Sequence, residues 1–177
     1  MKWIVILWSL VFSGLPSPIE QYIGSYKDLA IVEMHRTGVP ASIKLAQAIL
    51  ESQSGTSSFA SNTNNHFGIK CKSTWSGDKY YHKDDDKNDL GELIPSCFRS
   101  YERVEDSYVD HSNFLAQRNY YAKLWTIPRT DYKAWAHGLQ SCGYATDPLY
   151  AEKLIKIIER EHLYHFDEVK ESELHIK

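Results

Sequence analysis

The stretch from Ala46 to Gly55, AQAILESQSG, combines good helix formers with a single acid, Glu51, near its end. A helix on a protein surface normally shows several charges on its outer face, yet no ionisable residue separates Lys44 from Glu51. Apolar residues recur at helical spacing through this segment and predict a largely apolar helix; they are Ile43, Ala46, Ile49 and Leu50. Glu51 either marks the point where that helix reaches water or is a carboxyl held half-buried for a purpose.

Further helices are expected on both sides of this segment. The first is expected over about residues 21–37 and ends at Gly38. The second is the one described above, which Ser42 is expected to cap and which should stop near Ser54 and Gly55. Three later helices are expected. The first is in VEDSYVDHSNFLAQ, with Ser107 or the acidic residues before it near the cap, and the second is in TDYKAWAHGLQSCG and starts after Thr130. The third is in DPLYAEKLIKIIEREH, with Asp147 as its cap and Pro148 at the first helical position.

Between residues 57 and 99 the sequence changes character, because Asn, Ser, Gly, Lys and Asp dominate it. Three runs rich in aromatic and β-branched residues, FGIKCK, DKYYHK and SCFRSY, predict two or three short strands. The charged segment HKDDDKNDLGE is expected to be an exposed loop between them. The predicted fold class is therefore α+β, a mostly helical body with a small β-lobe, and a cleft between the two is a natural ligand site.

Length and charge limit the class of protein. A chain of 177 residues suits one domain, and a net charge of -3 leaves no basic surplus for binding nucleic acid. The sequence has no Gly-rich phosphate loop, no GxSxG and no HExxH, and its histidines are not at metal-ligand spacing. We therefore expect neither a metal nor an organic cofactor, and we expect a monomer.

The N-terminal segment MKWIVILWSLVFSG, residues 1–14, is typical of a secretory signal. Lys2 precedes an uncharged apolar run that is too short to span a membrane, and small residues suit cleavage after Ser13. The alternative is a buried N-terminal helix. We expect the mature protein in a periplasm or outside the cell, without stable membrane insertion, with one domain over residues 19–167 and a charged tail over 168–177.

Three cysteines follow the predicted signal. Cys71 and Cys97 flank one polar segment, so in an oxidising compartment we expect these two to pair and Cys142 to stay free. The alternative is three reduced thiols.

Carboxylate chemistry is the chemistry that the remaining residues favour. A carboxyl against apolar walls is disfavoured as an anion, so the pKa of Glu51 should be raised. A carboxylic acid that is protonated near neutral pH can donate its proton to a leaving oxygen, as glycoside hydrolysis requires. Taken alone this signal is weak, because most glutamates at helix ends are simply solvated.

Four sequence motifs in order strengthen this interpretation. The segment VPASIKLAQAILESQSGTSSFASNTNNHFGIKC carries an AQAxLES helix and an NNxFGIK turn, CFRSY carries an FRxY strand, and GLQSCGYATDPLYAEKLIKIIE carries a GYATDxxYAxKL helix. In these motifs the chain resembles glycoside hydrolase family 73, the FlgJ-type and autolysin-type N-acetylglucosaminidases with a mannosyl-glycoprotein endo-β-N-acetylglucosaminidase-like domain. The resemblance extends over about Ile19 to Asp167.

The resemblance implies a lysozyme-like α+β fold and cleavage of the β-1,4 bond after N-acetylglucosamine in peptidoglycan. It implies that Glu51 is the general acid. It places a second carboxylate before the FRxY strand, where Asp85 is our first choice, narrowly over Asp84, with Asp86 and Glu92 as further candidates. That group would activate water or stabilise an oxocarbenium-like charge, unless the acetamido group of the substrate assists in its place.

Other motif residues are candidates for substrate contacts. Tyr144 matches a family tyrosine that lines the cleft and could orient the acetamido group or the water. Asn65, Phe67 and Gly68 match the turn beneath the cleft, and a glycine there lets the backbone approach a sugar closely. The alternative for all four is a structural role. The alternative functions are an N-acetylmuramidase that uses the same acid, a glycan-binding module without catalysis, and a lytic protein delivered by a phage or toxin system.

Overall fold

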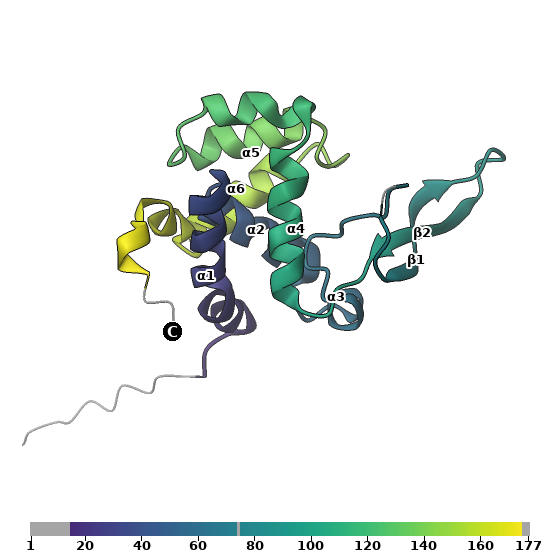
Figure 1. Cartoon of the computed structure of the whole chain (residues 1–177), viewed down its shortest axis with the longest axis horizontal. Helices are drawn as coiled ribbons and strands as arrows, with labels where there is room; N and C mark the ends of the chain where they lie inside the picture. The colour runs from purple at the N-terminus through teal and green to yellow at the C-terminus, as the bar shows by residue number, and fades with distance from the viewer. Residues whose placement is uncertain (1–14, 74, 175–177) are drawn as a thin grey trace, which may run out of the picture.

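The computed structural model describes residues 15–73 and 75–174, except for the side chain of Asp85. Figure 1 shows a helical body from which one β-hairpin projects to the side. The elements in chain order are α1 (Pro18–Thr37), α2 (Ala41–Ser52), α3 (Ser58–Thr63), β1 (Lys79–Lys87), β2 (Leu93–Arg99), α4 (Val104–Ala116), η1 (Asn119–Thr126), α5 (Tyr132–Ser141), α6 (Tyr150–Arg160), η2 (Leu163–Glu168) and η3 (Glu171–Glu173). The predicted class, a mostly helical body with a small β-lobe, is confirmed.

Helix α2 lies at the centre of the body. Ten of its 12 residues are buried, and it packs against α1, α5, α6 and η2. A helix surrounded by other elements has no solvent face for charges, which explains why the segment before Glu51 is so apolar. The prediction of a helix here is confirmed.

The N-terminus of α2 is capped from a distant part of the chain, and the predicted cap was wrong. Pro40 occupies the N-cap position and has no side-chain acceptor. The buried carboxylate of Asp167, in η2, accepts the Ser42 backbone N–H at 2.8 Å and the Ser42 hydroxyl at 2.6 Å. Ser42, the second residue of the helix, is therefore a donor in its first turn. Burial raises the pKa of Asp167 to about 6.

The C-terminus of α2 lies at Ser52, before the expected Ser54 and Gly55. Gln53, Ser54 and Gly55 all have positive φ angles, of 53°, 57° and 76°. The Ser52 hydroxyl accepts the backbone N–H of Gly55 at 2.7 Å and holds this turn. The helix stops early because the chain enters the left-handed region two residues before the glycine, and Glu51 is consequently in the last turn of α2.

The β-hairpin pairs β1 and β2 antiparallel, with Tyr81 opposite Cys97. The register shifts between the pairs Lys83–Pro95 and Lys87–Leu93, so β1 bulges at residues 84–86. Pro95 has no N–H for a regular ladder. The expectation of a loop over residues 82–92 was wrong for its first part, because the three aspartates lie within β1, and is confirmed for residues 88–92, which connect the strands.

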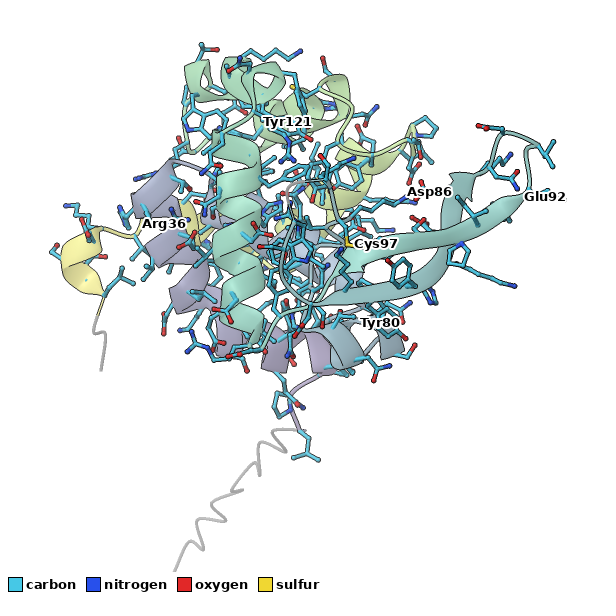
Figure 2. All side chains as sticks on the ribbon, turned by 45° about the vertical axis from the view of Figure 1, so that its right-hand side comes forward. Arg36, Tyr80, Asp86, Glu92, Cys97 and Tyr121 are labelled. Carbon is cyan, nitrogen blue, oxygen red and sulfur yellow. A yellow bond between two sulfur atoms is a disulfide. The ribbon has the colours of Figure 1, made fainter. Side chains whose placement is uncertain are left out.

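The hairpin is fixed to the rest of the molecule at its base. A disulfide joins Cys71 to Cys97, with Cα atoms 5.3 Å apart, and confirms the predicted pair, while Cys142 is free. At the end of β2, Arg99 Nη1 lies 2.7 Å from Oδ2 of Asp110 in α4, and the hydroxyl of Tyr101, two residues later, donates to that same oxygen at 2.5 Å. Figure 2 shows the hairpin extending from Cys97 at this base to Glu92 at its tip.

The later helices begin and end within a few residues of their expected positions. Helix α6 begins at Tyr150 rather than Pro148, and Leu149 takes the N-cap position. The Asp147 carboxylate accepts the backbone N–H of Leu149 at 2.9 Å, so it closes the turn before the helix instead of capping it. Helix α4 begins at Val104, and its N-cap residue Arg103 donates its backbone N–H to Asp106 at 3.3 Å.

The predicted secretory signal, residues 1–14, lies outside the described residues and stays a prediction. Within residues 15–73 and 75–174, no helix combines the length and apolar character needed to cross a membrane.

Candidate active site

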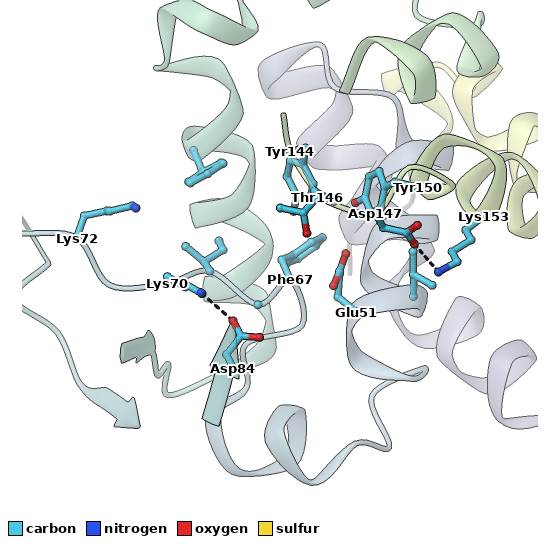
Figure 3. Close-up of a pocket in the computed structure, with 15 residues that line it drawn as sticks. Glu51, Phe67, Lys70, Lys72, Asp84, Tyr144, Thr146, Asp147, Tyr150 and Lys153 are labelled. Atoms are coloured by element: carbon cyan, nitrogen blue, oxygen red, sulfur yellow. Dashed lines mark hydrogen bonds and ion pairs between the residues drawn. The ribbon is translucent and has the colours of Figure 1, made fainter. Parts of the chain in front are cut away.

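A cleft of about 590 Å³ lies between the helical body and the base of the hairpin. The end of α2 and the turn that follows α3 form its floor, and β1 and the segment that leads into α6 form its sides (Figure 3). Its lining residues are Leu50, Glu51, Phe67, Gly68, Ile69, Lys70, Lys72, Asp84, Phe114, Tyr144, Ala145, Thr146, Asp147, Tyr150 and Lys153.

Glu51 projects from the last turn of α2 into this cleft. Its side chain is open to solvent through the mouth of the cleft, but protein surrounds it on the other sides. This loss of surrounding water raises the pKa of Glu51 to about 7, against a hydrogen bond from Tyr150 and the charge of Lys153, which lower it. Glu51 is therefore accessible to a ligand and about half protonated near neutral pH.

Tyr150, the first residue of α6, is held beside Glu51 by Gln47. The Gln47 side-chain amide donates to the Tyr150 hydroxyl oxygen at 2.9 Å. Because that oxygen already accepts a hydrogen bond, the phenolic proton is left for the Glu51 carboxylate. Burial raises the pKa of Tyr150 well above its usual value, so the phenol keeps its proton. Gln47 lies one turn before Glu51 on α2, so helix geometry places these two side chains on one face, beside Tyr150 of α6.

Asp84 lies across the cleft from Glu51 (Figure 3). Its Oδ2 is 2.8 Å from Nζ of Lys70, which also binds Asp86 at 2.9 Å. The negative charge of Asp84 raises the pKa of Glu51, so the two carboxyls influence each other electrostatically. The β1 bulge redirects side chains in this strand.

The structure separates the four candidates for the second carboxylate. Asp84 lines the cleft. Asp86 forms a hydrogen bond with Lys70 but is not itself one of the lining residues. Glu92 is at the hairpin tip, where its backbone N–H and carboxylate bind the Asn88 side chain. Asp85 is in β1, but its side chain lies outside what the structure describes, so its catalytic role stays a prediction.

The turn at residues 65–69 forms part of the cleft floor. Asn65 is buried and does not line the cleft: its side chain donates to the carbonyls of Ile69 and Arg99 at 3.0 and 2.9 Å and accepts the Ile69 N–H at 3.0 Å. Phe67 lines the cleft and stacks on His111 with ring centroids 4.0 Å apart. Gly68 has a φ of +62°, so glycine suits this position because of its backbone angle, and the space beside it is open.

Tyr144 lines the cleft on the side of the body, as expected. Its ring stacks on Tyr150, with centroids 5.5 Å apart and planes at 25°. Burial raises the pKa of the Tyr144 phenol well above its usual value. A protonated hydroxyl close to the acid can donate a hydrogen bond to a ligand.

Five of the residues chosen from the sequence line one cleft, and their catalytic and binding roles stay predictions; they are Glu51, Asp84, Phe67, Gly68 and Tyr144. Sequence reasoning missed the contributions of Tyr150, Gln47 and the three cleft lysines, Lys70, Lys72 and Lys153. Gln47 and Tyr150 are 103 positions apart, so no local pattern links them. The spacing of Gln47 and Glu51 by one helical turn was the available signal.

Comparison with known proteins finds one family along most of the chain. The sequence model for mannosyl-glycoprotein endo-beta-N-acetylglucosaminidase matches residues 27–163. Exo-glucosaminidase LytG of Bacillus subtilis strain 168 is 34% identical over 155 residues, which are 85% of this chain and 54% of LytG. Peptidoglycan hydrolase FlgJ of Vibrio parahaemolyticus is 32% identical over 142 residues, 78% of this chain and 46% of FlgJ. The chain thus spans about half the length of these curated relatives.

Solved structures share the fold. The catalytic domain of the autolysin Auto from Listeria monocytogenes superposes with a TM-score of 0.75 at 25% identity, covering 92% of this chain and 99% of that domain. A peptidoglycan hydrolase from Sphingomonas sp. A1 gives a TM-score of 0.68 at 30% identity, covering 82% and 91%. The expected lysozyme-like α+β fold is confirmed.

Proposed function

Since the chain belongs to the mannosyl-glycoprotein endo-beta-N-acetylglucosaminidase family, we propose that it hydrolyses the β-1,4 bond after N-acetylglucosamine in peptidoglycan. The observation that carries this proposal is the accessible carboxyl of Glu51, with a pKa of about 7, in a cleft that also holds Asp84. Two relatives support the proposal by their names: LytG is a glucosaminidase, which agrees with the proposed bond, and FlgJ is a peptidoglycan hydrolase, which agrees with the proposed polymer.

Glu51 acts as the general acid in the proposed reaction. In its protonated form it donates a proton to the glycosidic oxygen as the bond to the leaving sugar breaks. The carboxylate that results is stabilised by the Tyr150 hydroxyl and by the nearby charge of Lys153. Gln47 sets the direction of the Tyr150 hydrogen bond, since its amide donates to the phenol oxygen. The rigid α2 helix keeps the acid in place.

Asp84 replaces Asp85 in our proposal as the second carboxylate, because it lines the cleft opposite the acid. Its ion pair with Lys70 holds the group in its place within the bulge. There it stabilises positive charge on the sugar ring or activates the attacking water. On the side of the cleft formed by the helical body, the Tyr144 hydroxyl donates a hydrogen bond to the acetamido group of the sugar. If that acetamido group is itself the nucleophile, loss of Asp84 will have little effect.

The proposed site of action is a periplasm or the cell exterior. The predicted signal over residues 1–14 and the Cys71–Cys97 disulfide both support an oxidising compartment outside the cytoplasm. Action as a monomer is part of the same proposal.

Product analysis tests the bond that is cleaved. The purified chain is incubated with purified peptidoglycan, and the soluble fragments are reduced with borohydride and identified by mass spectrometry. Fragments that end in reduced N-acetylglucosamine support the proposal. Fragments that end in reduced N-acetylmuramic acid would make the protein a muramidase, and a folded protein that releases no fragments would be a binding module.

A further inference from the structure

Three lysines line the cleft, and two of them are engaged by acidic side chains. Lys70 binds Asp84 and Asp86, and Lys153 binds Asp147. The third, Lys72, is exposed and has no carboxylate within ion-pair distance among the described residues. The chain has a net charge of -3, so the presence of Lys72 in the cleft does not follow from a general excess of basic residues.

The backbone at Lys72 is held on both sides. The preceding residue, Cys71, forms the disulfide with Cys97 and donates its N–H to the Cys97 carbonyl at 2.7 Å. The Lys72 carbonyl accepts the N–H of Trp75 at 2.9 Å. A cation on such an anchored segment loses less backbone freedom when a ligand binds, which favours recognition.

The position of Lys72 relative to the acid indicates which part of a substrate it would meet. Lys72 and Glu51 line the same cleft, and Figure 3 shows them on separate walls, with Lys72 on the segment that follows the Phe67 turn. A sugar bound at Glu51 therefore places its neighbours and their substituents along the wall that carries Lys72.

We propose that Lys72 binds a carboxylate of the peptide attached to the glycan strand, so that the protein prefers anionic, peptide-bearing glycan over neutral glycan. This inference rests on the proposed function. N-acetylglucosamine carries no charge, and the carboxylates of peptidoglycan are on the peptides and on those lactyl groups that carry no peptide. Lys72 is exposed in the cleft, and among the described side chains none forms an ion pair with it, although its charge lowers the pKa of Asp86. Such a lysine can form a charge-assisted hydrogen bond to a carboxylate of the substrate.

The test compares two polymers made from one peptidoglycan preparation. One keeps its carboxylates, and in the other they are converted to neutral N-methylamides with methylamine and a carbodiimide. Both kcat/KM and binding in a pelleting assay are measured for the wild type, Lys72→Met and Lys72→Arg. Lys156→Met is the matched control, because Lys156 is an exposed lysine of α6 outside the cleft lining.

The wild type should prefer the charged polymer by about fivefold, the order expected for an exposed charged pair. Lys72→Met should abolish this preference by weakening action on the charged polymer alone, whereas Lys72→Arg and Lys156→Met should keep it. High salt should reduce the wild-type preference. An unchanged preference in Lys72→Met overturns the inference. If the wild type cleaves neither polymer, the proposed function fails, and the pelleting assay still decides whether Lys72 recognises the carboxylates.

Discussion

Removing the hydroxyl of Tyr150 should raise the pH at which the protein loses activity. Glu51 must be protonated to act as an acid, so activity falls as the pH rises through its pKa of about 7. The Tyr150 hydroxyl donates to the Glu51 carboxylate and thereby lowers this pKa. Tyr150→Phe keeps the ring and removes the donor, so the pKa of Glu51 should rise and the alkaline limb of the pH profile should move upward.

The size of this change follows from the energy of a hydrogen bond to a charged group. Such bonds contribute about 1.5–3 kcal/mol, and we take about 1.5 kcal/mol because the Glu51 carboxyl is open to solvent. A pKa change of one unit corresponds to about 1.4 kcal/mol. The alkaline midpoint of kcat/KM should therefore move from about 7 to about 8.

The assay is the initial rate at which reducing ends are released from soluble peptidoglycan strands across the acidic to alkaline range. Circular dichroism establishes that the variant is folded, since Tyr150→Phe leaves the buried Gln47 amide without its acceptor. Tyr120→Phe, which changes an exposed tyrosine outside the cleft, is the control and should keep the wild-type midpoint. A folded Tyr150→Phe protein with an unchanged or lower midpoint would refute the reasoning.

Three further perturbations test other parts of the structure. Asp84→Asn should lower kcat by about a hundredfold and move the alkaline midpoint down, because the negative charge that raises the Glu51 pKa is lost; a wild-type pH profile would contradict this. Replacing both Cys71 and Cys97 by Ser opens a link across 26 positions and should lower the unfolding free energy by about 3 kcal/mol in urea, whereas identical unfolding curves would count against it. Burial raises the pKa of Asp167 from 3.8 to about 6 in the folded protein. Between these two pH values the carboxyl is ionised in the unfolded chain but still protonated in the folded protein. The unfolding free energy of the wild type should therefore fall by about 3 kcal/mol as the pH rises through this range. Asp167→Asn lacks this titration, and its unfolding free energy relative to wild type should increase by that amount from about pH 4 to 7; a constant difference would argue against the buried carboxyl.

The central helix and its acid could be predicted from sequence because their signal is local. The run before Glu51 has the composition of a helix with no solvent face, and α2 is buried on all sides. The Cys71–Cys97 pair was also predictable, since the two residues flank one polar lobe. The ordered motifs around Glu51, Phe67 and Tyr144 brought these residues to one cleft.

The features that sequence reasoning missed depend on contacts between distant segments. Asp167 caps α2 from 125 positions beyond Ser42, and the local pattern suggested Ser42 itself. The aspartate triplet at residues 84–86 lies within β1, opposite a partner strand that carries Pro95, and the register shifts there. Sequence spacing alone does not fix that register, so it could not show that Asp84 faces the acid.

The central claim is that Glu51 is the acid that cleaves the glycan, and Glu51→Gln tests it most directly. An amide of similar size keeps the shape of the side chain and cannot donate that proton. Turnover of purified peptidoglycan by wild type and Glu51→Gln is measured side by side, with pelleting to compare binding. We predict that binding is kept and that turnover falls by about a hundredfold to ten-thousandfold. Near-wild-type turnover by a folded Glu51→Gln protein would contradict the account.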